Sequence, residues 1–543
     1  MKVIIAKIGR WPKAARQSTL RAVLGFIVLA LVTACDFSGR EGAPAPGVVV
    51  PNEAKGFIGG AVADEPHAVL VARDVLAVGG TAADAAVALY FTLAVTYPIN
   101  AGLGGGGSCL VYKPGKEFGT DVTEVLEFAS VASKLKPRAG GQASALPTAV
   151  RGMAALHARY GAVRWGNLLA PSEQMARLGF EVSRALVQDL NRNSGASDDE
   201  AARGMFAGRS GKPLAEGDSL MMLDLAGVIA QLRLKGAGDF YVGGLAQRLI
   251  ASVEAIGGTL SLDELRAVTS NWRPTASFAI GKDVLHTAPN ENGLSALRLF
   301  AVLADKDRYT RAPLDERPHL MAEASQRARS AKGAMIDPTK IAALMSGYSP
   351  ARHASLAEKS TAAPVADQVG TSFSVVDRAG MAVACNVTLN RRFGTGRVAP
   401  GLGLLLAASP GDSDPAASFV PALLVNHNTH QVLLAAAASS GAVGSSALAT
   451  VLRGLLIEQQ ALPAALAAPR IHNSGVPDLT AIEPGLAGSA AKALEARGHH
   501  VREVPALGQV GAIACLGGLP RSPETCAFAS DPRGFGLGVG GVF

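Results

Sequence analysis

A run of glycines separates an apolar helical stretch from a strand-like one early in the chain. The sequence Gly102-Leu103-Gly104-Gly105-Gly106-Gly107 follows an alanine-rich stretch of helical periodicity at 81–97 and precedes a β-like run at 108–112. Its spacing matches the Gly-x-Gly-x-x-Gly fingerprint of dinucleotide-binding proteins, but that fingerprint needs a strand before the glycines and a helix after them. The order is reversed here, so we discount a dinucleotide site. We expect a structural role instead, in which bare backbone passes close to a central sheet.

The remaining patterns place helices mainly in the first part of the chain and strands mainly in the second. Apolar spacing and caps predict helices at 62–78, 150–160, 167–178, 222–234, 244–256, 294–304, 317–331, 445–459 and 488–497. Residues 333–369 are weakly periodic and are expected to be an extended connector. After them, Asp377-Arg378-Ala379-Gly380 predicts a hairpin turn between β-like runs, and further runs lie at 402–407, 422–424 and 432–436. This order suggests helices packed over sheets.

The first 35 residues have the pattern of an export signal. Six Lys and Arg residues and no acid precede a short apolar run at 22–32, which is below the ~20 residues that a membrane span needs. The following Val32-Thr33-Ala34-Cys35 resembles a bacterial lipobox, in which Cys35 becomes lipidated. An ordinary secretory signal and an uncleaved anchor are the alternatives. We expect 36–55 to be a flexible tether and the body to be lipid-anchored on the periplasmic side.

Net charge argues against a nucleic-acid partner. The formal charge is +7, but the six basic residues before Cys35 leave about +1 for everything after them. A nearly neutral body without a basic run is not suited to neutralising phosphates. With 48% hydrophobic residues the chain can bury a large core, which excludes a disordered protein.

The four cysteines after Cys35 fall into two groups. Cys515 and Cys526 flank a turn between two short β-like runs, and a hairpin there would allow a disulfide in an exported protein. Cys109 and Cys385 lie in apolar runs and are expected to be small buried side chains rather than nucleophiles. The histidines are scattered, and the pair His499-His500 at a helix end is expected to be solvated. No zinc-binding, Walker A or Gly-x-Ser-x-Gly motif occurs, so no metal or cofactor is expected.

Longer motifs resemble those of the γ-glutamyltranspeptidase (glutathione hydrolase) family. The stretch from Gly79 to Val87, Gly-Gly-Thr-Ala-Ala-Asp-Ala-Ala-Val, followed by the four glycines at 104–107, is similar to the family's GGNAxDAAVA and GxGGGG. Further ordered matches are Asp224-Leu225-Ala226, Gly257-Gly258-Thr259-Leu260-Ser261-Leu262, Ser374-Val375-Val376-Asp377, Phe393-Gly394-Thr395-Gly396, Ala467-Ala468-Pro469-Arg470 and Ala529-Ser530-Asp531-Pro532-Arg533. The resemblance covers residues 56–543.

The resemblance implies an α+β fold, the four-layer αββα sandwich of N-terminal-nucleophile hydrolases. A large-subunit-like part at 56–369 and a small-subunit-like part at 370–543 would share one domain. Family members cut themselves before a Thr, whose hydroxyl then attacks while its new free amine acts as base. The γ-glutamyl group of glutathione passes through a Thr ester to water or an amino acid. A γ-glutamyl compound or an amino acid is therefore the expected ligand.

Several positions depart from the family pattern. Counting back from Ser374 places Gly370 at the nucleophile position, and only a one-residue shortening would place Thr371 there. The Arg that clamps the substrate carboxylate reads Ala129, which removes a charge-assisted contact of about 1.5–3 kcal/mol. The paired Ser reads Ala417-Ser418, and the Gly-Gly of the oxyanion hole reads Val443-Gly444.

Other positions match the family around the nucleophile and substrate: Thr388, Asn390 and Asp412, together with the remaining Ser418 and Gly444. Three functions stay open on this basis. The chain is a working γ-glutamyl hydrolase or transferase that uses Thr371, a noncatalytic relative with a weakened amino-acid pocket, or an enzyme for a different γ-linked or amide substrate. The combined losses favour the noncatalytic relative.

Overall fold

The computed structural model describes residues 56–117, 119–137, 143–192, 200–207, 212–331, 340–356, 370–410 and 419–542. Within these ranges two antiparallel sheets form the centre. The first sheet has the order β22 (Leu537–Val542), β1 (Phe57–Ala63), β11 (Thr371–Asp377), β12 (Ala382–Thr388), β2 (Gly106–Lys113), β3 (Val122–Phe128) and β8 (Asn271–Pro274). The second has the order β21 (Cys526–Ala529), β20 (Gln509–Leu519), β16 (Gln431–Ser439), β15 (Val420–Asn426), β10 (Asp283–Thr287) and β9 (Ala276–Ile280).

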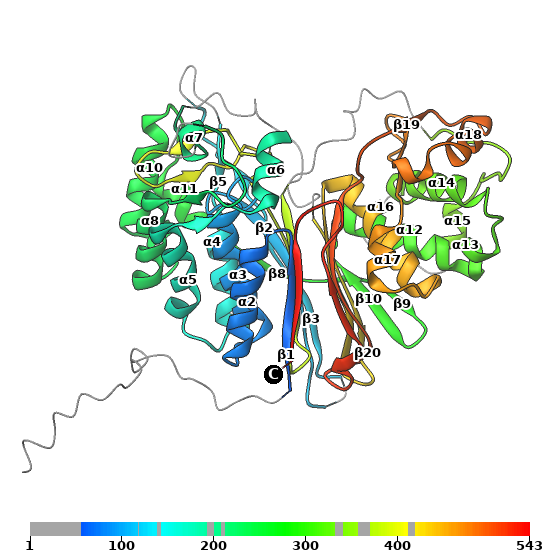
Figure 1. Cartoon of the computed structure of the whole chain (residues 1–543), viewed down its shortest axis with the longest axis horizontal. Helices are drawn as coiled ribbons and strands as arrows, with labels where there is room; N and C mark the ends of the chain where they lie inside the picture. The colour runs from blue at the N-terminus through cyan, green and yellow to red at the C-terminus, as the bar shows by residue number, and fades with distance from the viewer. Residues whose placement is uncertain are drawn as a thin grey trace, which may run out of the picture. The chain divides into compact units, whose positions relative to one another are not determined.

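Helices cover the outer face of each sheet, which gives four layers (Figure 1). Helices α2 (Pro66–Ala77), α3 (Ala82–Thr96) and α4 (Ala149–Tyr160) pack on the first sheet, and α12 (Glu291–Ala304) and α16 (Gly441–Leu452) pack on the second. Side chains of both inner faces meet in an apolar layer that includes Tyr112, Val376, Leu423 and Ile513. The architecture is the αββα sandwich that the resemblance implied. The first sheet contains strands of both parts: β1, from 56–369, lies between β22 and β11, which both come from 370–543.

The outer helices extend both helical layers. Beyond α3 and α4 lie α5 (Trp165–Leu178), α6 (Arg184–Arg192), α7 (Glu200–Met205), α8 (Leu223–Lys235), α9 (Asp239–Val242), α10 (Gly244–Ala255) and α11 (Leu262–Ala267). On the side of α12 and α16 lie α13 (Arg308–Arg311), α14 (Arg317–Ser330), α15 (Ile341–Leu344), α17 (Leu462–Ala467) and α18 (Ser489–Ala496). A small sheet of β17 (Ile471–Asn473), β18 (Thr480–Ile482) and β19 (Val501–Glu503) accompanies α14 and α18. Among the described residues no helix is both long and apolar enough to span a bilayer.

Local hydrogen bonds explain two of the sequence motifs. Thr81 and Asp84 form a capping box at the start of α3, and the buried Asp84 carboxylate also accepts from the backbone N–H of Ala162. The Gly-Gly-Thr-Ala-Ala-Asp motif therefore starts one helix and ties it to the end of another. In the β11–β12 turn, Asp377 accepts from Met381 N–H with one carboxylate oxygen and from Ala82 N–H with the other. The turn is thereby attached to the same helix start.

The structure corrects some predicted boundaries. The predicted helix at 62–78 is a strand to residue 63, β1, followed by α2, because the first apolar residues pair with β11 and β22. The β-like run at 402–407 holds only β14 (Leu404–Leu405), which pairs with β13 (Val398–Ala399). The helix predicted at 445–459 begins earlier, as α16, and its last turn is a π-helix at Arg453–Ile457.

Both cysteine pairs form disulfides. Cys515 and Cys526 face each other across β20 and β21. The prediction for Cys109 and Cys385 was incomplete, since both are fully buried but are bonded to each other. They are 276 residues apart in sequence and become neighbours because β2 and β12 pair in the register that sets them directly opposite. No local pattern indicates that register.

Candidate functional site

The candidate site lies where β11 begins and β12 ends, on the face that looks toward the second sheet. Ser372 Oγ donates to the Ala437 carbonyl over 3.1 Å, and Asn386 Nδ2 donates to the Ala438 carbonyl over 2.8 Å. Both acceptors belong to β16, so these side chains join the two sheets. Because side chains alternate along a strand, Thr388 shares this inner face with Asn386.

Gly370 stands on the same inner face, next to Thr388. Its φ is +82°, and a Cβ built on it would lie 2.4 Å from the Val387 carbonyl oxygen and 2.9 Å from the Thr388 Cβ. Both distances are shorter than real Cβ contacts allow. The backbone conformation and the close approach thus suit glycine, and a side chain at this position would point at Thr388.

Thr371 points the other way. It pairs with Val387 in the β11–β12 ladder and shares with Phe373 the face that the helices cover. Its hydroxyl is buried and donates to Asp64 Oδ2 over 2.7 Å, and the Ser372 N–H donates to the same oxygen over 3.1 Å. Burial raises the pKa of Asp64 to about 6, against the lowering effect of these hydrogen bonds. The Thr371 hydroxyl therefore belongs to a buried hydrogen bond on the helix-covered face of the first sheet.

Thr388 and Asn390 are held by local hydrogen bonds. Thr388 Oγ1 accepts from the Asn390 N–H over 2.9 Å. Asn390 has a φ of +65°, and its side-chain amide donates to Ser130 Oγ over 2.9 Å and to the Ala408 carbonyl over 2.7 Å. The glycine run lies directly beside them, since a Cβ on Gly105 would be 2.3 Å from the Thr388 carbonyl oxygen. Because Gly104 and Gly105 have no Cβ, the backbone of the glycine run lies directly against the backbones of Leu405 and Thr388.

A pocket of about 710 Å³ lies beside the glycine run, because Thr148 in its wall has its hydroxyl 3.3 Å from the Gly105 carbonyl oxygen; Gly370 and Thr388 do not line it. Its wall includes Ala129, which stands where the family pattern has its carboxylate-clamping Arg, together with Glu127 and Thr148. Glu127 is paired with Arg273, whose Nε lies 2.7 Å from the carboxylate and whose side chain is exposed. The wall of the pocket thus carries no guanidinium at residue 129.

The proposed oxyanion residues lie at the start of α16. Gly444 is buried there, and its N–H points to the Ser440 carbonyl at 3.4 Å. The Val443 side chain packs with Ala481 and Leu507 and is 4% exposed. Asp412 and Ser418, the remaining predicted ligand residues, lie outside the described residues.

Other family-like motifs stabilise the C-terminal part of the chain. Arg470 is fully buried, donates to the carbonyls of Leu507 and Gly508, and pairs with Asp531. Arg533 pairs with Glu483 and Asp531. The Pro-Arg and Ser-Asp-Pro-Arg motifs therefore support β20 and its neighbours, and their charged side chains form structural ion pairs.

Two side chains differ from expectation or were missed. Both His499 and His500 were expected to be solvated, and His500 is exposed as predicted. The prediction for His499 was wrong, because the α18–β19 turn folds onto α14 and leaves the His499 side chain only 4% exposed. Asp64 was missed, since the predicted helix at 62–78 hid the end of β1. An acid directly after an apolar strand was the available signal.

The comparisons with known proteins agree with one another. The family model described as Gamma-glutamyltranspeptidase matches residues 68–540. A glutathione hydrolase proenzyme of Pseudomonas aeruginosa is 29% identical, over 89% of this chain and 94% of the relative, and one of Escherichia coli K12 is 27% identical, over 93% and 97%. Among solved structures, a cephalosporin acylase from Bacillus halodurans superposes with a TM-score of 0.74 at 20% identity, over 92% of this chain and 98% of the other, which shows the fold.

Proposed function

Because this chain belongs to the γ-glutamyltranspeptidase family, we propose that it is a noncatalytic or strongly impaired member of it, exported and held at a membrane by a lipid on Cys35. The observation that carries the proposal is the pair of neighbours at the start of β11. Gly370 faces Thr388 on the inner face, whereas the Thr371 hydroxyl is on the helix face and bonded to Asp64. The hydroxyl and the candidate site are on opposite sides of one strand.

The chemistry of the family needs a hydroxyl with a base fixed beside it. Glycine supplies no hydroxyl. For Thr371 to replace it, β11 would have to slip by one residue, and such a slip turns every side chain of a strand to the opposite face. Phe373 and Val375, which are completely buried against the helices, would then leave their core. They would enter the layer between the two sheets, where Ser372 now reaches the Ala437 carbonyl, and such overpacking costs about 1–3 kcal/mol.

The substitutions at the positions that bind substrate in the family also argue against turnover. Ala129 cannot donate the two hydrogen bonds of a guanidinium to a carboxylate. We therefore expect the 710 Å³ pocket to bind a γ-glutamyl compound or an amino acid weakly, without turnover. Heating curves test this: glutamate or glutathione should raise the melting temperature, and Asp412→Ala should remove the shift.

One observation favours a second candidate, an active enzyme that uses Thr371. The Asp64 carboxylate accepts a hydrogen bond from the Thr371 hydroxyl over 2.7 Å, so a base lies beside that hydroxyl. The curated relatives include glutathione hydrolase proenzymes. This candidate requires self-cleavage between Gly370 and Thr371, and a site that opens on the helix face.

Hydrolysis of a chromogenic γ-glutamyl anilide separates the two candidates. We expect no turnover above that of a blank preparation. Turnover that Thr371→Ala abolishes and Thr371→Ser partly keeps would establish the active enzyme. Turnover that Thr371→Ala leaves unchanged would indicate a contaminant or another nucleophile. The lipid anchor is tested separately, because Cys35→Ser should move the protein from the membrane pellet to the soluble fraction.

A further inference from the structure

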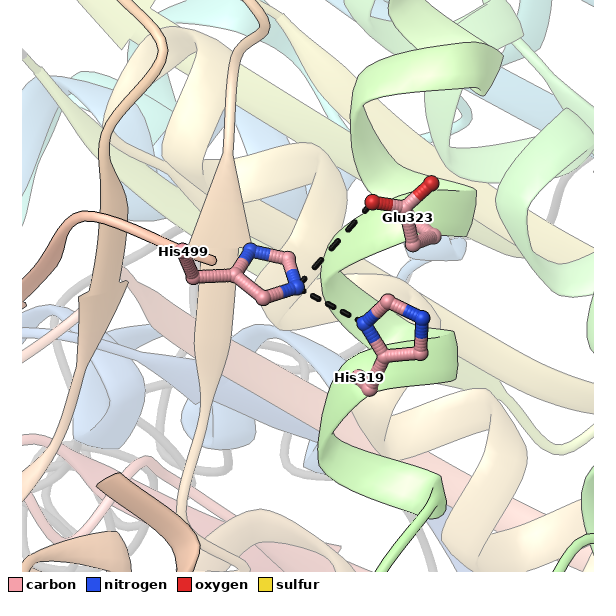
Figure 2. Close-up of side chains that lie close together, drawn as sticks. All are labelled: His319, Glu323 and His499. Carbon is pink, nitrogen blue, oxygen red and sulfur yellow. Dashed lines mark hydrogen bonds and ion pairs between the residues drawn. The ribbon is translucent and has the colours of Figure 1, made fainter. Parts of the chain in front are cut away.

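Three buried side chains converge at the end of the second helical layer, far in sequence from residues 370–371. His319 and Glu323 lie four residues apart on one face of α14, and His499 reaches them from the α18–β19 turn (Figure 2). His319 Nδ1 and His499 Nε2 are 2.7 Å apart, and His499 Nε2 is 4.0 Å from Glu323 Oε1. One ligand atom from each residue lies within 4.8 Å of the others. His319 and Glu323 are 0% exposed and His499 is 4% exposed.

In each of the two histidines, the ring nitrogen that faces away from the other histidine is hydrogen-bonded to an oxygen atom. His319 Nε2 donates to the Ser349 carbonyl over 2.8 Å, so the neutral ring has its lone pair on Nδ1, which faces His499. His499 Nδ1 lies 2.9 Å from Thr480 Oγ1. Burial lowers the pKa of both rings, which favours their neutral forms. Neutral imidazoles whose far nitrogens are hydrogen-bonded to oxygen are typical of metal ligands.

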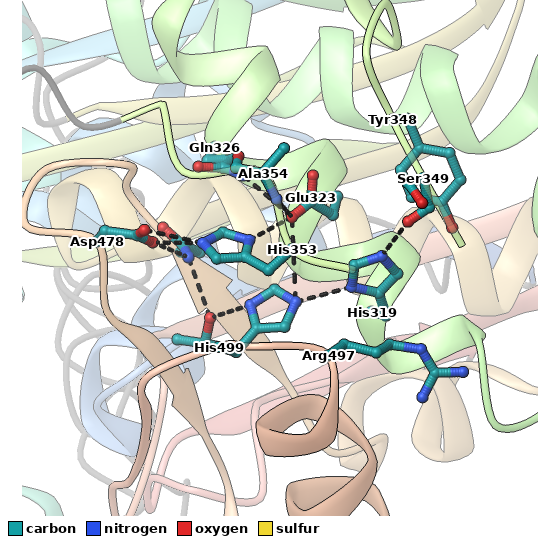
Figure 3. A network of polar contacts seen from close by, with 12 residues as sticks. His319, Glu323, Gln326, Tyr348, Ser349, His353, Ala354, Asp478, Arg497 and His499 are labelled. Atoms are coloured by element: carbon teal, nitrogen blue, oxygen red, sulfur yellow. Dashed lines mark hydrogen bonds and ion pairs between the residues drawn. The ribbon is translucent and has the colours of Figure 1, made fainter. Parts of the chain in front are cut away.

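The carboxylate is oriented by a further set of side chains (Figure 3). His353 Nδ1 contacts Glu323 Oε1, and its Nε2 lies 2.8 Å from Asp478 Oδ2. Arg327 pairs with the second oxygen of Glu323. The His353 ring stacks on that of His499, with centroids 4.1 Å apart. Glu323 is therefore held in place from both sides before any ion binds.

We propose that His319 Nδ1, His499 Nε2 and the Glu323 carboxylate bind one divalent transition-metal ion, with zinc as the best fit. Two imidazoles and one carboxylate form a known zinc ligand set. Zinc bonds of 2.0–2.2 Å in tetrahedral geometry keep ligand atoms about 3.4 Å apart, and the observed 2.7 and 4.0 Å lie on either side of that value. His319 and Glu323 place their ligand atoms at most 4.8 Å apart, so changes of up to about 1.4 Å in these separations bring the three atoms to it.

Binding replaces the hydrogen bond between His499 and His319 and takes an acceptor position on Glu323 Oε1, which in the metal-free protein accepts from Gln326 Nε2 and the Ala354 N–H over 3.2 and 3.3 Å. It needs no other reactant. In the metal-free protein His499 Nε2–H donates to His319 Nδ1. On binding, the His499 proton is carried on Nδ1 instead, where Thr480 Oγ1 accepts it, and Nε2 gives its lone pair to the ion. The ion would join α14 to the α18–β19 turn, so its role would be to stabilise this layer. No motif spacing in the sequence signals it, because His499 is 176 positions beyond Glu323.

The test is metal analysis of the purified, chelator-treated full-length protein after incubation with zinc chloride and gel filtration. We expect about one zinc per chain, an increase in melting temperature with added zinc, and, with cobalt(II) instead, the strong visible absorption of a tetrahedral site. Glu323→Gln should lower the zinc content at least tenfold. Less than a tenth of an equivalent retained by the parent protein, with an unchanged melting temperature, would overturn the proposal.

A matched variant controls for other histidines. His286 Nε2 and His427 Nε2 also face each other, at 3.1 Å, beside Asp121, but this second cluster is partly exposed. His427→Gln should therefore keep the full equivalent of zinc. Zinc lost in His427→Gln but kept in Glu323→Gln would overturn the assignment. Should Glu323→Gln fail to fold, the cobalt spectrum and the His427→Gln zinc content still decide.

Discussion

Replacing Gly370 by alanine tests the position on which the functional argument depends. The added Cβ would lie 2.4 Å from the Val387 carbonyl oxygen and 2.9 Å from the Thr388 Cβ, and the residue would have to keep a φ of +82°. The left-handed conformation costs about 1–2 kcal/mol for an L-residue. Overpacking against a rigid strand costs about 1–3 kcal/mol more. We expect Gly370→Ala to lower the free energy of unfolding by about 2–5 kcal/mol.

Gly347 is a matched control for that experiment. Its φ is +74°, but nothing lies within 4 Å of a Cβ built on it. Gly347→Ala should therefore show only the conformational cost of about 1–2 kcal/mol. Both variants and the parent are compared by urea denaturation followed by fluorescence. Equal losses for the two variants, or a loss below about 1 kcal/mol for Gly370→Ala, would refute the placement of Gly370 against Thr388.

Three further predictions concern stability and pH. Because the pKa of Asp64 is raised to about 6 in the folded protein, ionisation of Asp64 should lower the free energy of unfolding as pH rises from about 4 to about 6. The variant Asp64→Asn should lose this pH dependence and be up to about 3 kcal/mol more stable than the parent at pH 8. Urea denaturation across pH measures both effects. Replacing both cysteines of the β2–β12 disulfide by serine should lower stability by about 5 kcal/mol, against about 3 kcal/mol for the β20–β21 disulfide, because the loops closed span 276 and 11 residues; equal losses in thermal unfolding would contradict this. Arg470→Met leaves Asp531 buried without its main cation and should cost at least about 3 kcal/mol; a folded variant with an unchanged melting temperature would exclude that ion pair as a stabilising element.

Elements with local signals were predictable from the sequence. The α3 start is marked by Thr81 and Asp84, whose capping box needs only neighbouring residues. The β11–β12 turn is likewise set by Asp377 and Gly380 within four residues. The end of β1 was not, because Val62 and Ala63 share the helical apolar spacing of the residues after them and become part of a strand only through pairing with β11 and β22.

The site was predictable only where the chain follows the family motifs. Thr388 and Asn390 come together as neighbours on one strand end. The Thr371–Asp64 contact, the Cys109–Cys385 disulfide and the burial of His499 depend on segments that are distant in sequence. Such contacts follow from sheet register and helix packing, which a single sequence does not specify.

The most direct test of the account is the intact mass of the purified protein, measured under denaturing conditions together with N-terminal sequencing. The account predicts one polypeptide that contains both the 56–369 and the 370–543 parts. Two fragments, the smaller of which begins at Thr371, would contradict it.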